Sequence, residues 1–391
     1  MEKQITQIAL ALRTSMAREN YAGFDPFDGL NSKLFRATGL NHFYLTRLAW
    51  QQFCKRSPVN VRPISLVGKT RNPKGVALTV LGMIEEVRRT KSNDLVDEII
   101  NLCDWLADQR CDRIKWTYSC WGYNFDWQSR AFFVQKGTPN LITTCYVARA
   151  LFNSGELLGK DGYRNIAIEA GHFIHRHLQV SRYGSQFYAY IPDDETFVHN
   201  ANLWGAAWVG LAGSELNDST LVDSAIINAR TSVAEQSDSG AWSYGQMPHH
   251  QFVDGFHTGF NLEALNLLRK SVATDEFDDN INVGMKYYRE NFFLEDGTAK
   301  YYQDRVYPLD MHSFSQGIIT LLNIADMRSD LALAKKIAGR AIESLYSTED
   351  MKFIYQRGRW LKNRIDYIRW TQSWAYLSFM LLARCIDEEE V

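Results

Sequence analysis

Residues 200–213, NANLWGAAWVGLAG, are the clearest copy of a helical segment that recurs along the chain and decides its fold. The segment begins at a polar residue and is rich in Ala, Gly and Leu, and small residues such as Gly205 let neighbouring helices approach closely. Related segments begin at Asn140, His257, His312 and Trp370. Successive starts are 60, 57, 55 and 58 residues apart. Such a regular step indicates a repeat architecture, in which each unit is one supersecondary structure.

Each repeat has four parts in the same order. A short aromatic couplet of strand-like character comes first, followed by a polar loop, the small-residue helix and a more amphipathic helix. The couplets are Trp121–Tyr123, Tyr188–Tyr190, Trp242–Tyr244, Tyr301–Tyr302 and Phe353–Tyr355. A looser copy upstream has Asn72 followed by Pro73, a residue type favoured in the first turn of a helix, and it brings the small-residue helices to six.

The amphipathic helices complete the predicted architecture. Apolar residues at helical spacing place them near residues 41–57, 94–109, 161–178, 218–236, 276–291 and 330–346. Six inner and six outer helices make a closed ring. We therefore predict an all-α fold, an (α/α)6 toroid of about six helix hairpins with short β-hairpin couplets at one rim. We expect a single domain over residues 1–391, with a capping helix in residues 1–24 and helical-hairpin repeats over residues 41–391.

The composition argues against several classes of partner. Of the 391 residues, 46% are hydrophobic, and 43 basic residues nearly balance 45 acidic ones. No Lys/Arg-rich run could follow a phosphate backbone, so we do not expect nucleic acid binding. No stretch approaches the ~20 apolar residues of a membrane span, and the first residues do not resemble a signal peptide. We therefore expect a cytoplasmic protein with no membrane span.

The loops that follow the couplets carry the candidate site. In a ring of hairpins they lie at one end, where the inner helices begin, and loops on a rigid scaffold commonly bind ligands. They are rich in Trp, Tyr, His, Asp and Asn, which suits a glycan, because aromatic rings stack on the CH faces of sugars while polar side chains pair with hydroxyl groups. The residues predicted to bind substrate are Trp121, Tyr123, Asp126, Trp127, Asn140, Asn200, Asn202, Arg364 and Trp370.

Two Asp–His pairs recur at equivalent places of adjacent repeats, Asp254 with His257 and Asp310 with His312. A nearby carboxylate orients an imidazole for general acid/base catalysis near neutral pH. The same aspartates could instead cap helices by accepting hydrogen bonds from first-turn amides. The residues predicted to take part in catalysis are His257, Asp254, Tyr244, Asp310, His312 and Asp194.

A metal site would have to use histidines of these loops. The candidates are His249, His250, His257 and His312. Their spacing matches no common zinc motif, and the six cysteines include no CxxC pair. We expect neither a metal nor another cofactor.

The repeat with its polar loops resembles the (α/α)6 toroid enzymes of polysaccharide metabolism, namely polysaccharide lyases, glucuronyl C5-epimerases and toroidal glycoside hydrolases. Residues 311–341 resemble the inner and outer helix pair near the end of the epimerase toroid. The segments FDPFDGLNS (24–32), CWGYNFDWQ (120–128), GTPN (137–140) and FHTGFN (256–261) are similar to those of bacterial proteins encoded among polysaccharide-assembly genes.

The resemblance also implies roles for individual residues. In lyases and epimerases of this type, one residue neutralises the uronate carboxylate and others remove or return the C5 proton. Asn200 or Asn202, His257 and Tyr244 would match these roles.

A second resemblance concerns residues 236–242, QSDSGAW, which fit the Q-x3-G-x-W element of squalene and terpene cyclases, also α/α toroids. In those proteins the element is a structural tie between a helix end and a turn. Their acidic D-x-D-D proton donor is missing here, since residues 192–195 read PDDE. The element therefore favours the toroid fold and not cyclisation.

Three functions remain open from the sequence. We expect first a carbohydrate-active enzyme of bacterial polysaccharide metabolism, acting by proton transfer, as a lyase or epimerase, or by hydrolysis. Hydrolysis would use two carboxylates, for which Asp126, Asp194, Asp254 and Asp310 are candidates. The alternatives are a non-catalytic glycan-binding or scaffold protein of a polysaccharide assembly system and a terpenoid cyclase-like enzyme.

Overall fold

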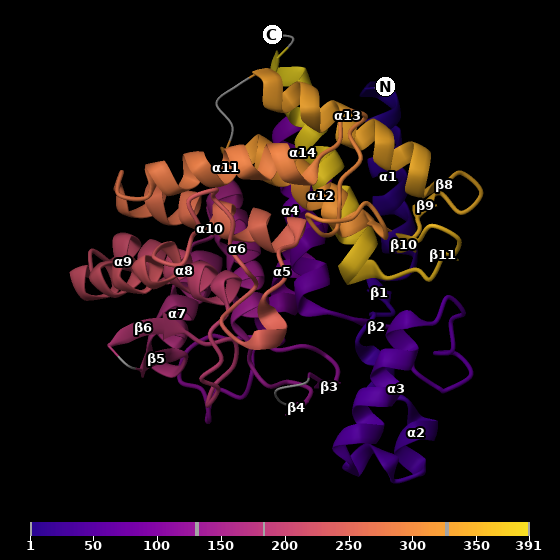
Figure 1. Cartoon of the computed structure of the whole chain (residues 1–391), viewed down its shortest axis with the longest axis horizontal. Coiled ribbons are helices and arrows are strands. Elements are labelled where there is room, and N and C mark those ends of the chain that lie inside the picture. The colour runs from indigo at the N-terminus through magenta and orange to yellow at the C-terminus, as the bar shows by residue number, and fades with distance from the viewer. Residues whose placement is uncertain (1, 130–132, 183, 325–327, 390–391) are drawn as a thin grey trace.

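Six inner helices form a closed ring in the computed structural model, which describes residues 2–129, 133–182, 184–324 and 328–389 (Figure 1). The inner helices are α4 (Pro73–Thr90), α6 (Leu141–Leu158), α8 (His199–Leu216), α10 (Gly255–Val272), α12 (Met311–Ile324) and α14 (Ser373–Glu389). Each packs against the next, and α14 packs against α4, so the first and last inner helices close the ring. The predicted six-hairpin toroid is confirmed.

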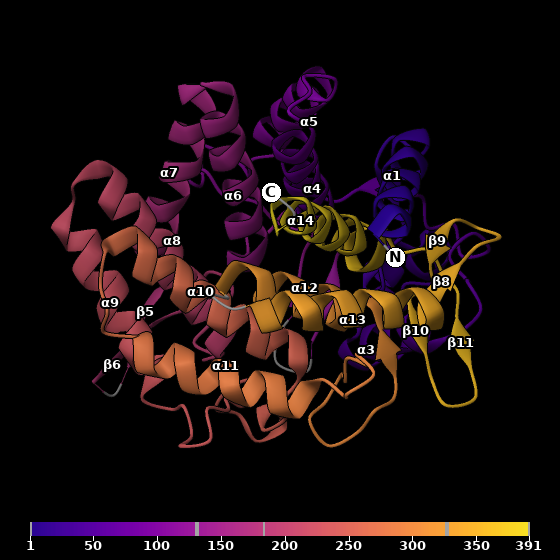
Figure 2. The same ribbon diagram turned by 90° about the horizontal axis from the view of Figure 1, so that it is seen from above.

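The outer helices lie around this ring, each beside the inner helix that precedes it in the chain (Figure 2). They are α5 (Val96–Asp108), α7 (Asp161–His177), α9 (Ser219–Val233), α11 (Asp278–Phe292) and α13 (Arg328–Leu345). Five of the six predicted outer segments therefore form outer helices within a few residues of the predicted bounds.

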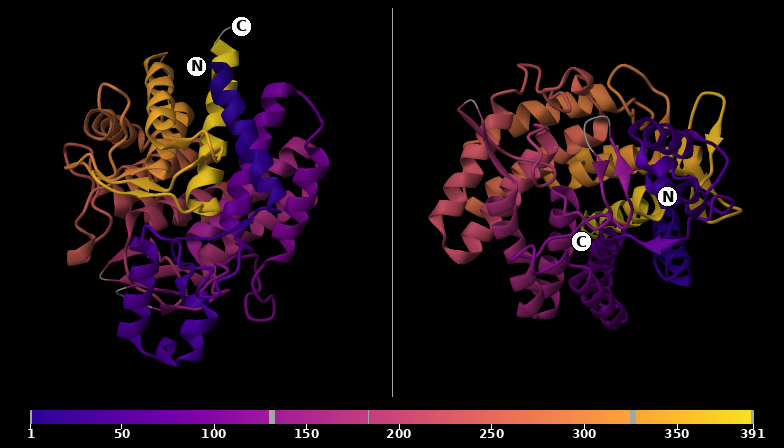
Figure 3. Two further views of the ribbon diagram at one scale, coloured as in Figure 1. Left: turned by 90° about the vertical axis from the view of Figure 1, so that its right-hand side faces the viewer. Right: turned by 90° about the horizontal axis from the view of Figure 1, so that it is seen from below.

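The sixth outer position corrects the prediction. It is occupied by α1 (Glu2–Arg18), which packs against α14 so that the two terminal helices lie side by side (Figure 3). The segment predicted for this position, residues 41–57, does form a helix, α3 (Tyr44–Arg56), but that helix packs with α2 (Lys33–Ala37) and its flanking turns. Both segments are amphipathic, but α1 buries five apolar side chains, whereas α3 buries only Gln51 and Cys54.

Side-chain caps fix where the inner helices begin. The Asn72 side chain accepts hydrogen bonds from the backbone amides of Lys74 and Gly75 at the start of α4. Asn140 and Asp254 cap α6 and α10 in the same way. Each cap satisfies amides that have no partner inside the helix, so the polar residue at the head of each repeat has a structural role.

The strands are short antiparallel pairs around the ring. Of the five predicted couplets, two place a residue in a strand of the described chain, namely Tyr188 and Phe353, so most couplet residues lie outside the strands. The two-stranded pairs are β1 (Ala22–Gly23) with β2 (Thr70–Arg71), β3 (Trp127–Gln128) with β4 (Phe133–Val134), β5 (Gln179–Arg182) with β6 (Ser185–Tyr188), and β8 (Tyr346–Ser347) with β9 (Lys352–Phe353). A three-stranded sheet has the order β11 (Lys362–Asn363), β10 (Gln356–Arg357), β7 (Leu309–Asp310). Among the helices of the described residues, none combines the length and apolar character needed to cross a membrane.

Candidate functional site

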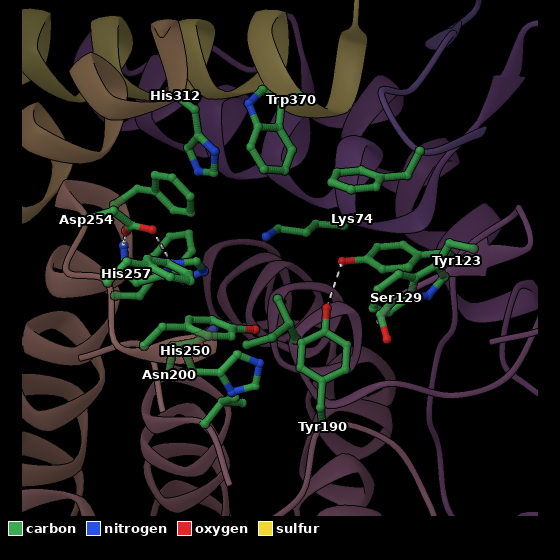
Figure 4. Close-up of a pocket in the computed structure, with 18 of the residues that line it drawn as sticks. Lys74, Tyr123, Ser129, Tyr190, Asn200, His250, Asp254, His257, His312 and Trp370 are labelled. Atoms are coloured by element: carbon green, nitrogen blue, oxygen red, sulfur yellow. Dashed lines mark hydrogen bonds and ion pairs between the residues drawn. The ribbon is translucent and has the colours of Figure 1, made fainter. Parts of the chain in front are cut away.

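A cavity of about 510 Å³ opens at the end of the ring where the inner helices begin. All six inner helices contribute a residue at or near their start, namely Lys74, Ile142, Asn200, His257, His312 and Trp370. Aromatic side chains make up much of the wall, and polar groups point inward between them (Figure 4). An apolar wall with a few convergent polar groups is the usual form of a small-molecule site.

The Asp254–His257 pair is the most clearly built element of this cavity. Asp254 caps α10 by accepting the His257 amide at 2.8 Å through Oδ1, while its Oδ2 lies 2.7 Å from His257 Nδ1. An ionised carboxylate only accepts hydrogen bonds, so Nδ1 carries a proton and Nε2 is the ring nitrogen left for a ligand in the cavity. The spacing of three residues on one helical turn brings the two side chains together.

His312 faces the same cavity from α12 without a polar partner. Its ring lies between Phe256 and Trp374, with centroids 4.8 Å and 4.5 Å away, and neither ring nitrogen has a hydrogen-bond partner among the described residues. Burial, and then the charge of nearby Lys74, lower the pKa of His312 well below its usual value. The ring is therefore neutral at neutral pH, with one donor and one acceptor available to a ligand.

Lys74 brings a cation into the centre of the cavity from the first turn of α4 (Figure 4). Its Nζ lies 4.2 Å from the centroid of the Tyr146 ring and 5.4 Å from that of Trp374, and it forms no ion pair with any described residue. Burial, and then the Arg369 guanidinium, lower the pKa of the Lys74 ammonium well below its usual value. An anionic ligand beside Nζ would restore the charge.

Arg369 lies in a π-helical turn (Ile368–Gln372) that precedes α14, an irregularity often found at functional sites. It forms a buried bidentate pair with Asp25, from the segment FDPFDGLNS. Burial works against the charge, yet the Asp25 carboxylate holds the pKa of the guanidinium above its usual range. Phe27 of the same segment lines the cavity, so this N-terminal segment forms part of the site.

Further polar groups are available on the opposite wall. The Tyr123 and Tyr190 hydroxyl groups lie 3.2 Å apart, and Asn200 Oδ1 and Asp194 Oδ2 are buried with no partner among the described atoms. Burial raises the pKa of Asp194, and burial together with His249 lowers the pKa of His250 to about 4. These side chains could pair with the hydroxyl groups of a sugar.

The structure brings together nine of the fifteen predicted site residues. The cavity is lined by Tyr123, Trp127, Asp194, Asn200, Tyr244, Asp254, His257, His312 and Trp370. The residues that do not line it are Trp121, Asp126, Asn140, Asn202, Asp310 and Arg364.

Three of the six have core or helix-capping roles, which corrects their predicted contact with substrate. The Trp121 ring is fully buried, and its Nε1 donates to the carbonyl oxygen of Leu106. Asn140 caps α6 by accepting the Thr143 amide. Asn202 is buried with its side chain bonded to the backbone of Tyr188 and Asn228.

The remaining three also lie off the cavity. Asp126 forms an ion pair with Arg36 at 2.8 Å, and Arg364 is exposed on the surface. Asp310 is fully buried and accepts from the His312 amide, Gln356 Nε2 and Trp370 Nε1, so it positions two cavity residues from behind. Burial raises the pKa of Asp310 to about 6.

The sequence reasoning missed several cavity residues, above all Lys74 and Arg369, and it missed Asp25, the partner of Arg369. Lys74 and Arg369 are cations at the start of inner helices that are otherwise mostly small and apolar. A charged residue at such a position is the sequence signal that could have identified them, since burying a charge is costly unless it is paired or binds a ligand. In the described part of the chain, no three His, Cys, Asp or Glu side chains gather closely enough to hold a metal ion.

The QSDSGAW element has the structural role expected from its sequence. Gln236 Nε2 donates to the carbonyl oxygens of Gly240 and Asn280, and Trp242 Nε1 donates to that of Ser232. It ties the end of α9 to the following turn and to α11, away from the cavity.

The closed ring and the place of its cavity define the class of the protein, an (α/α)6 toroid, and solved toroid enzymes superpose on most of the chain. A cellobiose 2-epimerase from Bacillus thermoamylovorans is 10% identical with a TM-score of 0.61, over 82% of this chain and 88% of the epimerase. An unsaturated glucuronyl hydrolase from Bacillus sp. GL1, responsible for the degradation of glycosaminoglycan, is 10% identical with a TM-score of 0.63, over 98% and 97% of the two chains.

A GH76 α-mannanase from Bacteroides thetaiotaomicron is 12% identical with a TM-score of 0.63, over 84% of this chain and 90% of the mannanase. No protein-family model matches the sequence, and no curated protein matches it. At the level of the fold, these neighbours confirm the resemblance to toroid enzymes of carbohydrate metabolism.

Proposed function

We propose that the protein is a glycan-active enzyme that transfers a proton at a sugar carbon, as an epimerase or a lyase. The observation that carries the proposal is the 2.7 Å contact between Asp254 Oδ2 and His257 Nδ1 inside the cavity. In the neutral form of the imidazole, this contact leaves Nε2 unprotonated, so that Nε2 can act as a general base toward the ligand space. Asp254 stabilises the imidazolium that forms when Nε2 takes a proton.

His312 supplies a second group for the same reaction. Because both of its ring nitrogens lack a protein partner, it can donate to or accept from a substrate hydroxyl group. Trp127 and Trp370 offer ring faces for stacking on the sugar, and Asn200 offers an amide oxygen. Together these groups support a bound sugar ring between the aromatic walls, with one of its carbons near His257.

Lys74 supports an acidic sugar as the substrate. A proton on a carbon next to a carboxylate becomes easier to remove when a cation neutralises that carboxylate. Two lysines of the cavity lining, Lys55 and Lys74, have no ion-pair partner among the described residues, whereas Arg369 is paired with Asp25. Of these two lysines, Lys74 is the one that comes from the first turn of an inner helix, as His257 and His312 do. A uronate carboxylate at Lys74 would replace the missing partner.

Hydrolysis has weaker support, because it needs two available carboxylates. Asp194 has a raised pKa and an unpaired Oδ2, as a general acid would. The other carboxylate of the cavity lining, Asp254, already has both oxygens bonded to His257.

The test is incubation in deuterated water with a panel of uronate-containing and neutral glycans. An epimerase incorporates deuterium at carbon without new reducing ends, and a lyase produces the ultraviolet absorbance of an unsaturated uronate. New reducing ends without either signal would show a hydrolase and overturn the proposal. Binding without any turnover would show a glycan-binding or scaffold protein.

A Lys74→Met variant tests the substrate class separately. Methionine keeps most of the side-chain volume but removes the charge, so KM for an acidic glycan should rise by ~10–100-fold, the effect of losing a charge-assisted contact. Lys335→Met, which breaks a surface pair between outer helix α13 and Glu389, is the matched control. An unchanged KM in Lys74→Met would reject the carboxylate assignment while leaving the proton-transfer assignment intact.

A further inference from the structure

The chain as a whole is nearly neutral, but two of its stretches contain no acidic residue. Residues 29–84 contain nine Lys or Arg residues and no Asp or Glu, and residues 351–365 contain five basic residues and no acidic one. The first stretch includes α2 and α3, and the second includes the hairpin formed by β10 and β11. Both stretches are therefore rich in basic residues and free of acidic ones, in a nearly neutral protein.

The same two stretches expose an unusual share of apolar side chains. Of the nineteen large apolar residues that are exposed in the described chain, nine lie within residues 34–66. They are Leu34, Leu40, Phe43, Tyr44, Leu45, Phe53, Val59, Ile64 and Leu66. At the tip of the β10–β11 hairpin, Trp360 is 86% exposed and Leu361 is 69% exposed. Concentrated exposed apolar residues indicate an interaction site.

The two stretches adjoin each other in the fold. Asn363 Nδ2 of β11 donates to the carbonyl oxygen of Ser57, just after α3, at 3.1 Å. Figure 1 shows the β10–β11 hairpin beside the loops that follow α3, on the same side of the ring. We call residues 33–66 and 359–364 together the docking face.

Five of the cations of the docking face are available to a partner. Lys33, Arg56, Arg359, Lys362 and Arg364 are all exposed. None of these five has a carboxylate within ion-pair distance among the residues that the structure describes. The Arg359 guanidinium lies 5.4 Å from the centroid of the Trp360 ring, so charge and aromatic surface are presented at one point.

We propose that the docking face binds the surface of an anionic membrane, with the side chains of Trp360 and the α3 region entering the headgroup layer. Tryptophan favours the interface between water and hydrocarbon, and nearby Lys and Arg are attracted to anionic lipid headgroups. Apolar residues interleaved with cations and free of acids are the composition of interfacial segments. This proposal is independent of the chemistry assigned to the cavity.

The aliphatic residues decide between a membrane and other anionic partners. Single-stranded nucleic acid is bound by cations and stacking aromatic rings. Such a partner would not explain the exposed aliphatic side chains of Leu45, Val59 and Ile64. A protein partner would have to be acidic and apolar over both stretches. A lipid surface satisfies the exposed apolar groups and the unpaired cations at once.

The experiment is flotation of the full chain with vesicles of phosphatidylcholine, with and without phosphatidylglycerol. We expect binding to the anionic vesicles that weakens as salt is added, and a blue shift of tryptophan fluorescence that is absent in Trp360→Phe. Arg359→Glu/Lys362→Glu should reduce the partition coefficient by at least ~10-fold, since each cation near an anionic surface contributes about fivefold.

Leu216→Ala is the matched control, because Leu216 is 44% exposed at the far end of α8 beside acidic residues. It should bind vesicles as the unaltered protein does, whereas Trp360→Ala/Leu361→Ala should not, with thermal unfolding unchanged in both. Equal binding to both vesicle types, or no binding, would overturn the proposal. Binding to single-stranded RNA alone, or dimerisation that Trp360→Ala abolishes, would also overturn it.

Discussion

The two Asp–His pairs occupy equivalent places in neighbouring repeats, yet the structure uses them differently. In the first, Asp254 bonds to both the amide and the ring of His257. In the second, Asp310 bonds to the amide of His312 but leaves the ring to stack between aromatic side chains. The spacing explains the difference, because the histidine follows the aspartate by three residues in the first pair and by two in the second.

This difference separates two kinds of imidazole in one cavity. A ring held by a carboxylate has a defined tautomer and can carry a positive charge, so it suits proton transfer. A ring enclosed by apolar faces stays neutral and can only exchange hydrogen bonds. Substitutions in the two pairs should therefore have effects of different kinds.

The largest effect is expected for His257→Ala. General acid/base catalysis contributes ~10²–10⁴-fold in rate, so turnover of the glycan substrate should fall by about that factor. Thermal unfolding should change by no more than a few degrees, because Asp254 Oδ1 still caps α10 through the backbone amide of residue 257. His172→Ala, on outer helix α7, is the control. Loss of several degrees in Tm with full activity per folded molecule would make His257 a structural residue.

Asp254→Asn should come next, with a loss of roughly 10²-fold in turnover, because an amide does not hold the imidazole in the required tautomer. Stability should be nearly unchanged, since Asn and Asp cap helices equally well. Asp218→Asn is the matched control, because Asp218 caps α9 through the same kind of contact far from the cavity. A measured loss of stability in Asp254→Asn well beyond that of the control would indicate a mainly structural role.

His312→Phe should lower glycan affinity by up to about 10-fold, the contribution of one hydrogen bond. Phenylalanine preserves the stacking with Phe256 and Trp374 and removes two buried nitrogens without partners. The free energy of unfolding, measured in urea, should therefore rise or stay equal. A clear loss of stability would show that the imidazole has a partner in the free protein and would weaken the contrast between the pairs.

Asp310→Asn should act mainly on the pH dependence of stability. The pKa of Asp310 is raised from 3.8 to about 6 in the fold, so the folded state binds the proton more tightly than the unfolded chain. The resulting stabilisation is present below pH ~4 and is lost as the pH rises through about 6, by roughly 3 kcal/mol. Relative to the variant, the unaltered protein should become less stable between pH 4 and pH 7 in urea unfolding. Parallel pH profiles would contradict this.

The ring could be predicted because its signals are local and repeated. Asn72 and Asn140, the polar residues at which two repeats begin, are the N-caps of α4 and α6. The step of about 57 residues corresponds to one hairpin with its loop. The sixth outer helix was wrong because α1 and α3 are both amphipathic, and only their packing partners distinguish them. Local patterns do not show which of two such helices reaches the ring.

Only part of the cavity lining could be predicted, because the sequence does not show which way a side chain points. The loops were placed correctly, but an aromatic couplet presents one ring to the core and another to the cavity, as Trp121 and Tyr123 show. Which ring faces inward depends on the turn between them. The Asp25–Arg369 pair joins residues 344 positions apart, and no local pattern indicates such a partner.

The closure of the ring by α4 and α14 also has a consequence for protein synthesis. Lys74 and its neighbour Trp374, like Asp25 and Arg369, come from opposite ends of the chain, and a Cβ on Gly82 would lie only 2.6 Å from the Tyr376 ring. Because α14 follows the other five inner helices in the chain, it is synthesised after them and completes both the seam and the cavity. A nascent or truncated chain that lacks α14 is an open crescent with an exposed apolar inner face, a surface that chaperones bind and other unfolded chains can join.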